Sequence, residues 1–189
     1  MTDPTFRITT PRLAISHLDP SNSLHCSFLV SLWNTPEFIA MLGGKPTSIT
    51  TPSAAKSLIQ NRFLAEHARN GYGMYLVSLL GDDTLVGTIS LMRGENSSLL
   101  APDIGFAMLS EHMRKGYAVE AAKALIEHVD GEKGVKAVFG FCHEGNEASM
   151  GVLRKLGFRW EGVRKVKEFE GKETAVWSWD MESVEEWGL

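Results

Sequence analysis

The sequence has little cysteine: only Cys26 and Cys142 occur among its 189 residues. Two cysteines are too few for the disulfide framework that holds many small secreted domains together. No apolar run approaches the roughly 20 residues that a transmembrane helix requires. The first residues, MTDPTFRITTPRL, lack the apolar core of a signal peptide. These absences favour a reducing, cytoplasmic setting and no membrane partner.

A strong net charge is also missing. The 19 Lys and Arg residues against 23 Asp and Glu residues leave a formal net charge of −4, which gives no electrostatic basis for binding nucleic acid. The six histidines show no metal-binding spacing such as H-E-x-x-H, so we expect no metal site. Hydrophobic residues make up 43% of the chain, which is enough to build a core. The length suits one domain, residues 1–189, with its core at about 10–181.

The apolar pattern switches between the strand period and the helix period along the chain. The expected strands are residues 12–18, 74–80, 85–92, 103–109, 135–142, 158–166 and 172–180. The expected helices are residues 25–41 with a break at Pro36, 52–70, the stretch after Gly116, and a short one that Asn146 opens and Gly157 ends. We expect Gly131 and Gly134 to end the helix after Gly116. This order predicts an α/β fold built on a mixed sheet.

Residues 103–118, DIGFAMLSEHMRKGYA, are the most informative stretch. An alternating strand runs into a short basic loop, and a helix follows at once. No Ser, Thr, Asp or Asn stands just before that helix, so its first backbone N–H groups lack both a helical partner and a side-chain cap. Such N–H groups bind anions, and Arg114 and Lys115 add positive charge beside them. We interpret this turn as a cradle for the pyrophosphate of a nucleotide-like cofactor.

Four short motifs follow one another in a set order. They are T-x-R-L at residues 10–13, I-G-F at 104–106, G-Y-A-x-E-A at 116–121, and N-x-x-S followed by K-L-G-F at 146–158. In this order and spacing, the chain from Arg12 to about Asp180 resembles the GNAT acyltransferase superfamily, in the branch of ribosomal-protein N-terminal acetyltransferases. The resemblance implies the GNAT fold: a mixed, mostly antiparallel sheet with helices on both faces and two central strands that splay apart.

The resemblance also implies that acetyl-coenzyme A binds as co-substrate at the uncapped helix. The family pattern Q/R-x-x-G-x-G/A lies over residues 113–118, with Met113 in place of the usual Gln or Arg. Pantetheine is expected between residues 106–109 and 139–143, where a free backbone N–H near Leu109 faces the thioester oxygen. For Asn146, a helix cap alone and a cap that also contacts the cofactor both remain open. The expected cofactor-binding residues are Leu109, Met113, Arg114, Lys115, Gly116, Tyr117, Ala118, Asn146 and Ser149.

The implied reaction is direct transfer of an acetyl group from the thioester to an amine, which attacks only when neutral. A protein α-amine has a reference pKa of about 8, against about 10.4 for lysine. A larger fraction of the α-amine is therefore neutral near pH 7, and it needs a weaker base to remove its proton. Asp103 is the first choice for the general base and Glu144 the second, although each is also consistent with a plain solvated carboxylate. Leu153 takes the place of the Tyr that many family members use as general acid.

Three functions remain open at the level of sequence. The first is an acetyl-CoA-dependent N-acetyltransferase, an acyltransferase enzyme that acts on a protein N-terminus, and the second acts on a small-molecule amine instead. The third is a non-catalytic acyl-CoA-binding domain, which Met113 and Leu153 keep in consideration. We expect the acceptor pocket to form from the 43–51 loop, the two early helices and the final hairpin. Because relatives often form dimers, a homodimer is also considered.

Overall fold

The computed structural model describes residue 3 and residues 5–189. The strands are β1 (Arg7–Thr9), β2 (Leu13–His17), β3 (Met74–Leu79), β4 (Leu85–Met92), β5 (Asp103–Met108), β6 (Val138–Cys142), β7 (Arg159–Val166) and β8 (Lys172–Trp179). The α-helices are α1 (Ser23–Trp33), α2 (Pro36–Met41), α3 (Pro52–Leu58), α4 (Leu64–Asn70), α5 (Tyr117–Lys133) and α6 (Glu147–Lys155). A π-helical segment, η1 (Ile59–Phe63), joins α3 to α4, and short 3-10 turns are η2 (Ser110–His112), η3 (Lys167–Phe169) and η4 (Glu185–Trp187).

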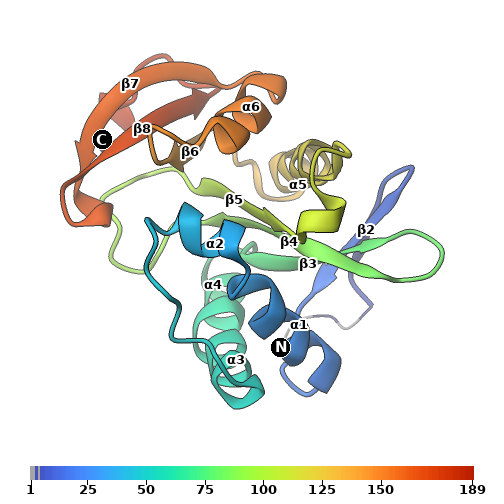
Figure 1. Cartoon of the computed structure of the whole chain (residues 1–189). Helices are drawn as coiled ribbons and strands as arrows, with labels where there is room; N and C mark the ends of the chain where they lie inside the picture. The colour runs from blue at the N-terminus through green and yellow to red at the C-terminus, as the bar shows by residue number, and fades with distance from the viewer. Residues whose placement is uncertain (1–2, 4) are drawn as a thin grey trace.

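The strands form one sheet in the order β1-β2-β3-β4-β5-β6-β8-β7. Neighbouring strands pair antiparallel except β5 and β6, which are parallel. Figure 1 shows α5 and α6 on one side of this sheet and α1 to α4 on the other. The expected α/β fold, with a mixed and mostly antiparallel sheet covered on both faces, is therefore confirmed.

Three details differ from the sequence prediction. Strand β1 was not expected, because a three-residue segment is too short to show an apolar period. The helix expected over 52–70 contains the π-helical segment η1, which apolar spacing does not reveal. Gly131 does not end α5: the helix continues to Lys133, and Gly134 ends it with a left-handed backbone at φ +66°.

Separate apolar clusters cover the two faces of the sheet. Under α5 and α6, residues such as Leu125, Ile126 and Leu153 pack against strand residues that include Ile104. Under α1 and α3, Leu29 and its neighbours form a second cluster. Within the described residues, no helix has the length and apolar content needed to cross a membrane.

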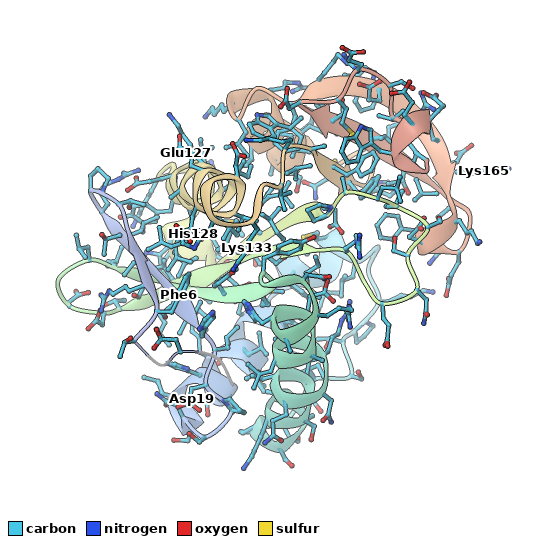
Figure 2. All side chains as sticks on the ribbon, turned by 180° about the vertical axis from the view of Figure 1, so that it is seen from behind. Phe6, Asp19, Glu127, His128, Lys133 and Lys165 are labelled. Atoms are coloured by element: carbon cyan, nitrogen blue, oxygen red, sulfur yellow. The ribbon has the colours of Figure 1, made fainter. Side chains whose placement is uncertain are left out.

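The N-terminal edge of the sheet is closed by aromatic packing. Figure 2 shows Phe6 and His128 on the back of the molecule, and their ring centroids lie 5.4 Å apart. Phe6 also stacks on His17 at 4.4 Å. This packing ties the start of the chain to α5 and β2.

The centre of the sheet is parted. Strands β5 and β6 pair only at Asp103 with Phe139 and at Ile104 with Gly140, although both strands continue beyond these pairs. The expected splay of the central strands is thus present. It begins later on β6 than we expected, because Phe139 and Gly140 are still paired.

Candidate active site

A cavity of about 640 Å³ opens beside the parted strands. It is bounded by the end of β5, the start of α5 and the first turns of α6, while α2 contributes Phe38 and Met41. Most of the residues expected to bind the cofactor meet in this first cavity. They are Met113, Arg114, Gly116, Tyr117, Ala118, Asn146 and Ser149.

The start of α5 has no side-chain cap. Gly116 stands at the N-cap with φ +81° and no capping side chain, and its carbonyl accepts a hydrogen bond from the N–H of Glu120. In the part of the chain that the structure describes, no acceptor is recorded for the N–H groups of Tyr117, Ala118 and Val119. All three residues line the first cavity. Free helix N–H groups at a cavity wall form a site for an anion.

The two basic residues before this helix play different parts. Arg114 is exposed, lines the first cavity and has a left-handed backbone at φ +58°. A non-glycine residue in that region costs roughly 1 kcal/mol, and such strain often occurs where a loop is shaped for binding. Lys115 is exposed but does not line the cavity. Its backbone carbonyl, however, is held by a residue from the start of the chain.

That residue is Arg12, which fastens the loop to the sheet. Arg12 Nη1 donates to the Lys115 carbonyl at 3.0 Å, and Arg12 Nε donates to Glu120 Oε2 at 2.7 Å. Its guanidinium lies 4.8 Å from the centre of the Tyr117 ring. Thr10 Oγ1 donates to the other oxygen of Glu120 at 2.6 Å. The T-x-R-L and G-Y-A-x-E-A motifs are therefore two halves of one contact.

Glu120 is stabilised as an anion by this contact. Burial alone would raise the pKa of its carboxyl, but hydrogen bonds from Thr10 and Arg12 and the charge of Arg12 outweigh that effect and lower it. Sequence reasoning noted both motifs but did not connect Arg12 with Glu120, because the two residues lie 108 positions apart.

Replacing Arg12 with Gln is expected to weaken acetyl-CoA binding by roughly threefold to tenfold, because a charged hydrogen-bond donor to the loop is lost. Titration calorimetry of the variant against wild type measures the change. Arg7→Gln is the matched control, since Arg7 pairs with the exposed Asp83 and neither residue lines the cavity. Equal affinity in Arg12→Gln and Arg7→Gln would contradict a role for Arg12 in holding the loop.

The N–H of Leu109 itself is not free, so the free N–H expected near this residue belongs to another position. Leu109 N–H donates to the carbonyl of Val86 at 2.9 Å, inside the ladder between β4 and β5. Residue 109 also does not line the first cavity. The physical reason is the alternation of backbone groups along a strand: residues two apart point their N–H groups to the same side.

The same alternation identifies the groups that face the gap. Because Leu109 bonds toward β4, the N–H groups of Phe106 and Met108 point the other way, toward β6. No pairing between β5 and β6 is recorded beyond Ile104 and Gly140, and all of both strands lies in the described part of the chain. Phe106 and Met108 both line the first cavity. These two N–H groups can donate to a ligand that enters between the strands.

A second cavity of about 460 Å³ lies at the other end of β5, on the side of α4. Asp103 is in its wall and is only partly exposed. Burial is the main cause that raises the pKa of Asp103 to about 7, and the negative charge of Glu66 raises this pKa further. A hydrogen bond from the backbone of Asp103 itself and the positive charge of Arg62 both act to lower the pKa. A carboxylate with a pKa near neutrality is suited to accept a proton at physiological pH.

Two small residues, Gly105 and Ala107, follow Asp103 on β5 toward the first cavity. Positions 103, 105 and 107 lie on the same face of β5, since alternate residues of a strand share a face. Gly105 has no side chain, and a Cβ there would lie 2.7 Å from Ser90 Oγ. Ala107 already belongs to the first cavity. Asp103 thus stands beside the point where the strands begin to part.

Glu66 is a buried charge that shapes the second cavity. Its side chain is 2% exposed, and Arg69 forms an ion pair with it. Glu66 Oε1 accepts hydrogen bonds from Asn70 Nδ2 at 2.7 Å and from the backbone N–H groups of Arg93 and Gly94 at 2.8 and 3.1 Å. Glu66 therefore fixes the loop after β4 against α4, and its lone pairs are used within the protein.

Other candidate residues lie outside the second cavity. Glu144 is exposed on the turn between β6 and α6 and lines neither of the two cavities. Leu153, in the place of the family's Tyr, is buried, with its Cδ2 2.6 Å from the position of a Cβ on Gly140. Burial raises the pKa of the Cys142 thiol to about 11, which makes it a poor nucleophile. Met113 is partly buried and packs against the main core.

Several residues of the site were missed by sequence reasoning. Arg62 and Arg93 line the second cavity from η1 and from the loop after β4, and Glu66 lines it from α4. His112 lines the first cavity, and its Nδ1 is buried with no partner among the described residues. Of the segments expected to form the acceptor pocket, the 52–70 helix and the final hairpin line the second cavity. The 25–41 helix lines only the first cavity, and the 43–51 loop lines neither. Only contacts between distant segments reveal these residues.

Comparison with known proteins agrees with this geometry. The family described as "Acetyltransferase (GNAT) domain" matches residues 12–159. "Uncharacterized N-acetyltransferase YnaD" of Bacillus subtilis (strain 168) is 29% identical over 160 residues, which are 84% of this chain and 85% of the relative.

Two solved structures share the fold. One, from Salmonella typhimurium, is an acetyl transferase described as modifying the N-terminal serine of 50S ribosomal subunit protein L7/L12; it has a TM-score of 0.74 at 18% identity and covers 94% of this chain and 100% of its own. The other is the microcin C7 self immunity acetyltransferase MccE in complex with acetyl-CoA and AMP; it has a TM-score of 0.73 at 16% identity and covers 91% of this chain and 94% of its own.

Proposed function

Because the chain belongs to the GNAT acetyltransferase family by its match over residues 12–159, we propose that it transfers an acetyl group from acetyl-CoA to a primary amine, with the α-amine of a protein N-terminus as the favoured acceptor. The observation that carries this proposal is the first cavity, where uncapped helix N–H groups and unpaired strand N–H groups line one space. The residues there fit a long ligand with an anionic end and a thioester end.

The residues of the first cavity divide the binding of acetyl-CoA between them. The N–H groups of Tyr117, Ala118 and Val119 hold the pyrophosphate, and Arg114 adds charge beside it. The N–H groups of Phe106 and Met108 donate to the pantetheine and the thioester oxygen between the strands. Asn146 Oδ1 accepts from the N–H of Ser149 at 3.0 Å and so caps α6, and both residues line the cavity.

The residues of the second cavity act on the acceptor. Asp103 accepts the proton of the attacking amine, either directly or through one water. Removal of that proton leaves the nitrogen lone pair free to attack the thioester carbon. As the tetrahedral intermediate collapses, the C–S bond breaks, CoA departs as a thiolate, and the nitrogen releases its second proton to solvent to give the amide. A thiol has a reference pKa of about 8.5, so the thiolate leaves without a strong acid, which is consistent with Leu153 in place of a tyrosine.

Two considerations favour an α-amine. Its reference pKa of about 8 lies close to the raised pKa of Asp103, so proton transfer between them is nearly balanced. The Salmonella neighbour acts on an N-terminal serine. A small-molecule amine is the second candidate, and the size of the second cavity, about 460 Å³, is compatible with either acceptor.

Addition of acetyl-CoA at 100 times its Kd is expected to stabilise the protein by about 2.7 kcal/mol, which raises the melting temperature by several degrees. Release of free CoA thiol in the presence of an amine panel then tests transfer. 3′-Phosphoadenosine 5′-diphosphate, which keeps the diphosphate and lacks pantetheine, is the control for the anion site alone. Absence of any shift with both acetyl-CoA and CoA contradicts the proposal, and binding without thiol release on any amine points to a non-catalytic acyl-CoA-binding domain.

A further inference from the structure

The second cavity contains charged side chains of both signs, and some of them are already satisfied. Glu66 is used by Arg69 and by backbone N–H groups, as described above. Glu168 Oε1 accepts hydrogen bonds from Ser98 Oγ at 2.7 Å and from Ser97 Oγ at 3.2 Å. These two carboxylates serve to hold the cavity walls together.

Other charged side chains in the cavity remain available. Within residues 3 and 5–189, no ion pair or side-chain hydrogen bond is recorded for Arg62, Arg93 or Glu95, and none with another side chain for Asp103, although all four line the cavity. The two arginines come from different walls, one from the helix and one from the loop after β4. A guanidinium presents paired donors that match a carboxylate or a phosphate.

The π-helical segment bears on the position of Arg62. Segment η1 interrupts a helix that otherwise runs from α3 into α4, and Asn61 and Arg62 within it both line the cavity. A π-helical turn adds a residue to the normal helical spacing and is frequently found at functional sites. Ala65, Glu66 and Arg69 continue the same cavity wall on α4.

We infer that the acceptor amine carries an anionic group, a carboxylate or a phosphate, close to the nitrogen that is acetylated. Arg62 and Arg93 bind that group while the amine faces Asp103. This inference rests on the proposed function. At a protein N-terminus the anion is an acidic side chain in the first residues, and in a small molecule it is the carboxylate of an amino acid or the phosphate of a phosphorylated amine.

The test compares acceptors that differ only in that charge. The peptide pair is Ser-Asp-Ala-Ala-Phe-amide and Ser-Asn-Ala-Ala-Phe-amide, and the small-molecule pairs are 4-aminobutyrate with its amide and phosphoethanolamine with ethanolamine. CoA thiol release at saturating acetyl-CoA gives kcat/KM for each. We expect the anionic member of at least one pair to be favoured by about tenfold or more, as charge-assisted hydrogen bonds from arginine provide. The pair that shows the preference identifies the source of the anion.

The variant Arg62→Gln/Arg93→Gln is expected to remove that preference, measured as the ratio of kcat/KM for the two members of a pair. Calorimetric titration with acetyl-CoA reports correct folding, because neither arginine lines the first cavity. Arg7→Gln, at the exposed pair with Asp83, is the matched control and keeps the preference. The inference is overturned if turnover shows no preference for the anionic acceptor in any pair, or if that preference survives in the double variant. Either result leaves the proposed function standing. No thiol release with any acceptor refutes the proposed function itself, and the inference with it.

Discussion

Asp103→Asn is expected to lower kcat for amine acetylation by about 100-fold to 10,000-fold, the range that a general base commonly contributes. Its affinity for acetyl-CoA should stay within about twofold of wild type, since Asp103 lies in the second cavity and not in the first. Steady-state CoA release and titration calorimetry measure the two quantities. Glu144→Gln serves as the comparison variant, because Glu144 is exposed and lines neither cavity.

The pH dependence makes this prediction sharper. Burial raises the pKa of Asp103 to about 7, so its carboxylate form is lost as the pH falls through 7, and the activity of the wild type should fall tenfold per pH unit below that value. The rate of Asp103→Asn should lack this inflection. If Glu144→Gln abolished the inflection instead, the base would have been assigned to the wrong carboxylate.

Stability provides a check that the variant is folded. An aspartate whose folded pKa is raised from 3.8 to about 7 binds more protons when folded than when unfolded between those values, so the wild type loses stability as the pH rises through this window. Asn does not titrate. Asp103→Asn should therefore melt higher than wild type at pH 8, with a smaller difference near pH 4, as read by differential scanning fluorimetry.

Ala118→Asp is expected to weaken acetyl-CoA binding by about 100-fold or more. The new carboxylate would stand in the first turn of α5, where the unpartnered N–H groups line the first cavity, and like charges brought together cost several kcal/mol. The free protein should not suffer in the same way, because an acidic residue at a helix start is favourable by about 0.3–1 kcal/mol. Calorimetric titration with acetyl-CoA and thermal melting of the free protein separate the two effects.

The neutral variant Ala118→Asn is the matched control, because it has the shape of Asp without its charge. If both variants lost affinity equally, the loss would come from crowding of the helix start and not from repulsion of an anion. If neither variant lost affinity, the pyrophosphate would bind elsewhere, and the proposed use of the uncapped helix would fail.

Local sequence patterns indicated the uncapped start of α5 and the strand that begins at Asp103. The absence of a capping residue before α5 is visible in the letters RKGYA, and Gly116 has no side chain that could take the place of an anion. Asp103 was chosen because it begins a recognisable strand at a position where the resembled branch often has Glu, and its role as base stays a prediction. In each case the information lies within a few residues of the feature itself.

Features that depend on distant segments were not predictable in the same way. Sequence patterns do not tell which N–H groups of a strand face its neighbour, so Leu109 was chosen where Phe106 and Met108 face the gap. Glu66 resembles any charged helical residue until the loop after β4 folds onto it. The three-residue strand β1 is recognisable only through its pairing with β2.

The short junction between β5 and β6 has a mechanical consequence. The sheet has two parts, one formed by β1 to β5 and the other by β6, β8 and β7. Only two residue pairs join these parts in the described sheet. Every other pair of neighbouring strands in the described sheet is joined by at least three residue pairs, so we expect the sheet to deform most easily along this line. A substrate bound between β5 and β6 would contact both parts of the sheet. We therefore expect the substrate-bound protein to be more rigid than the free protein.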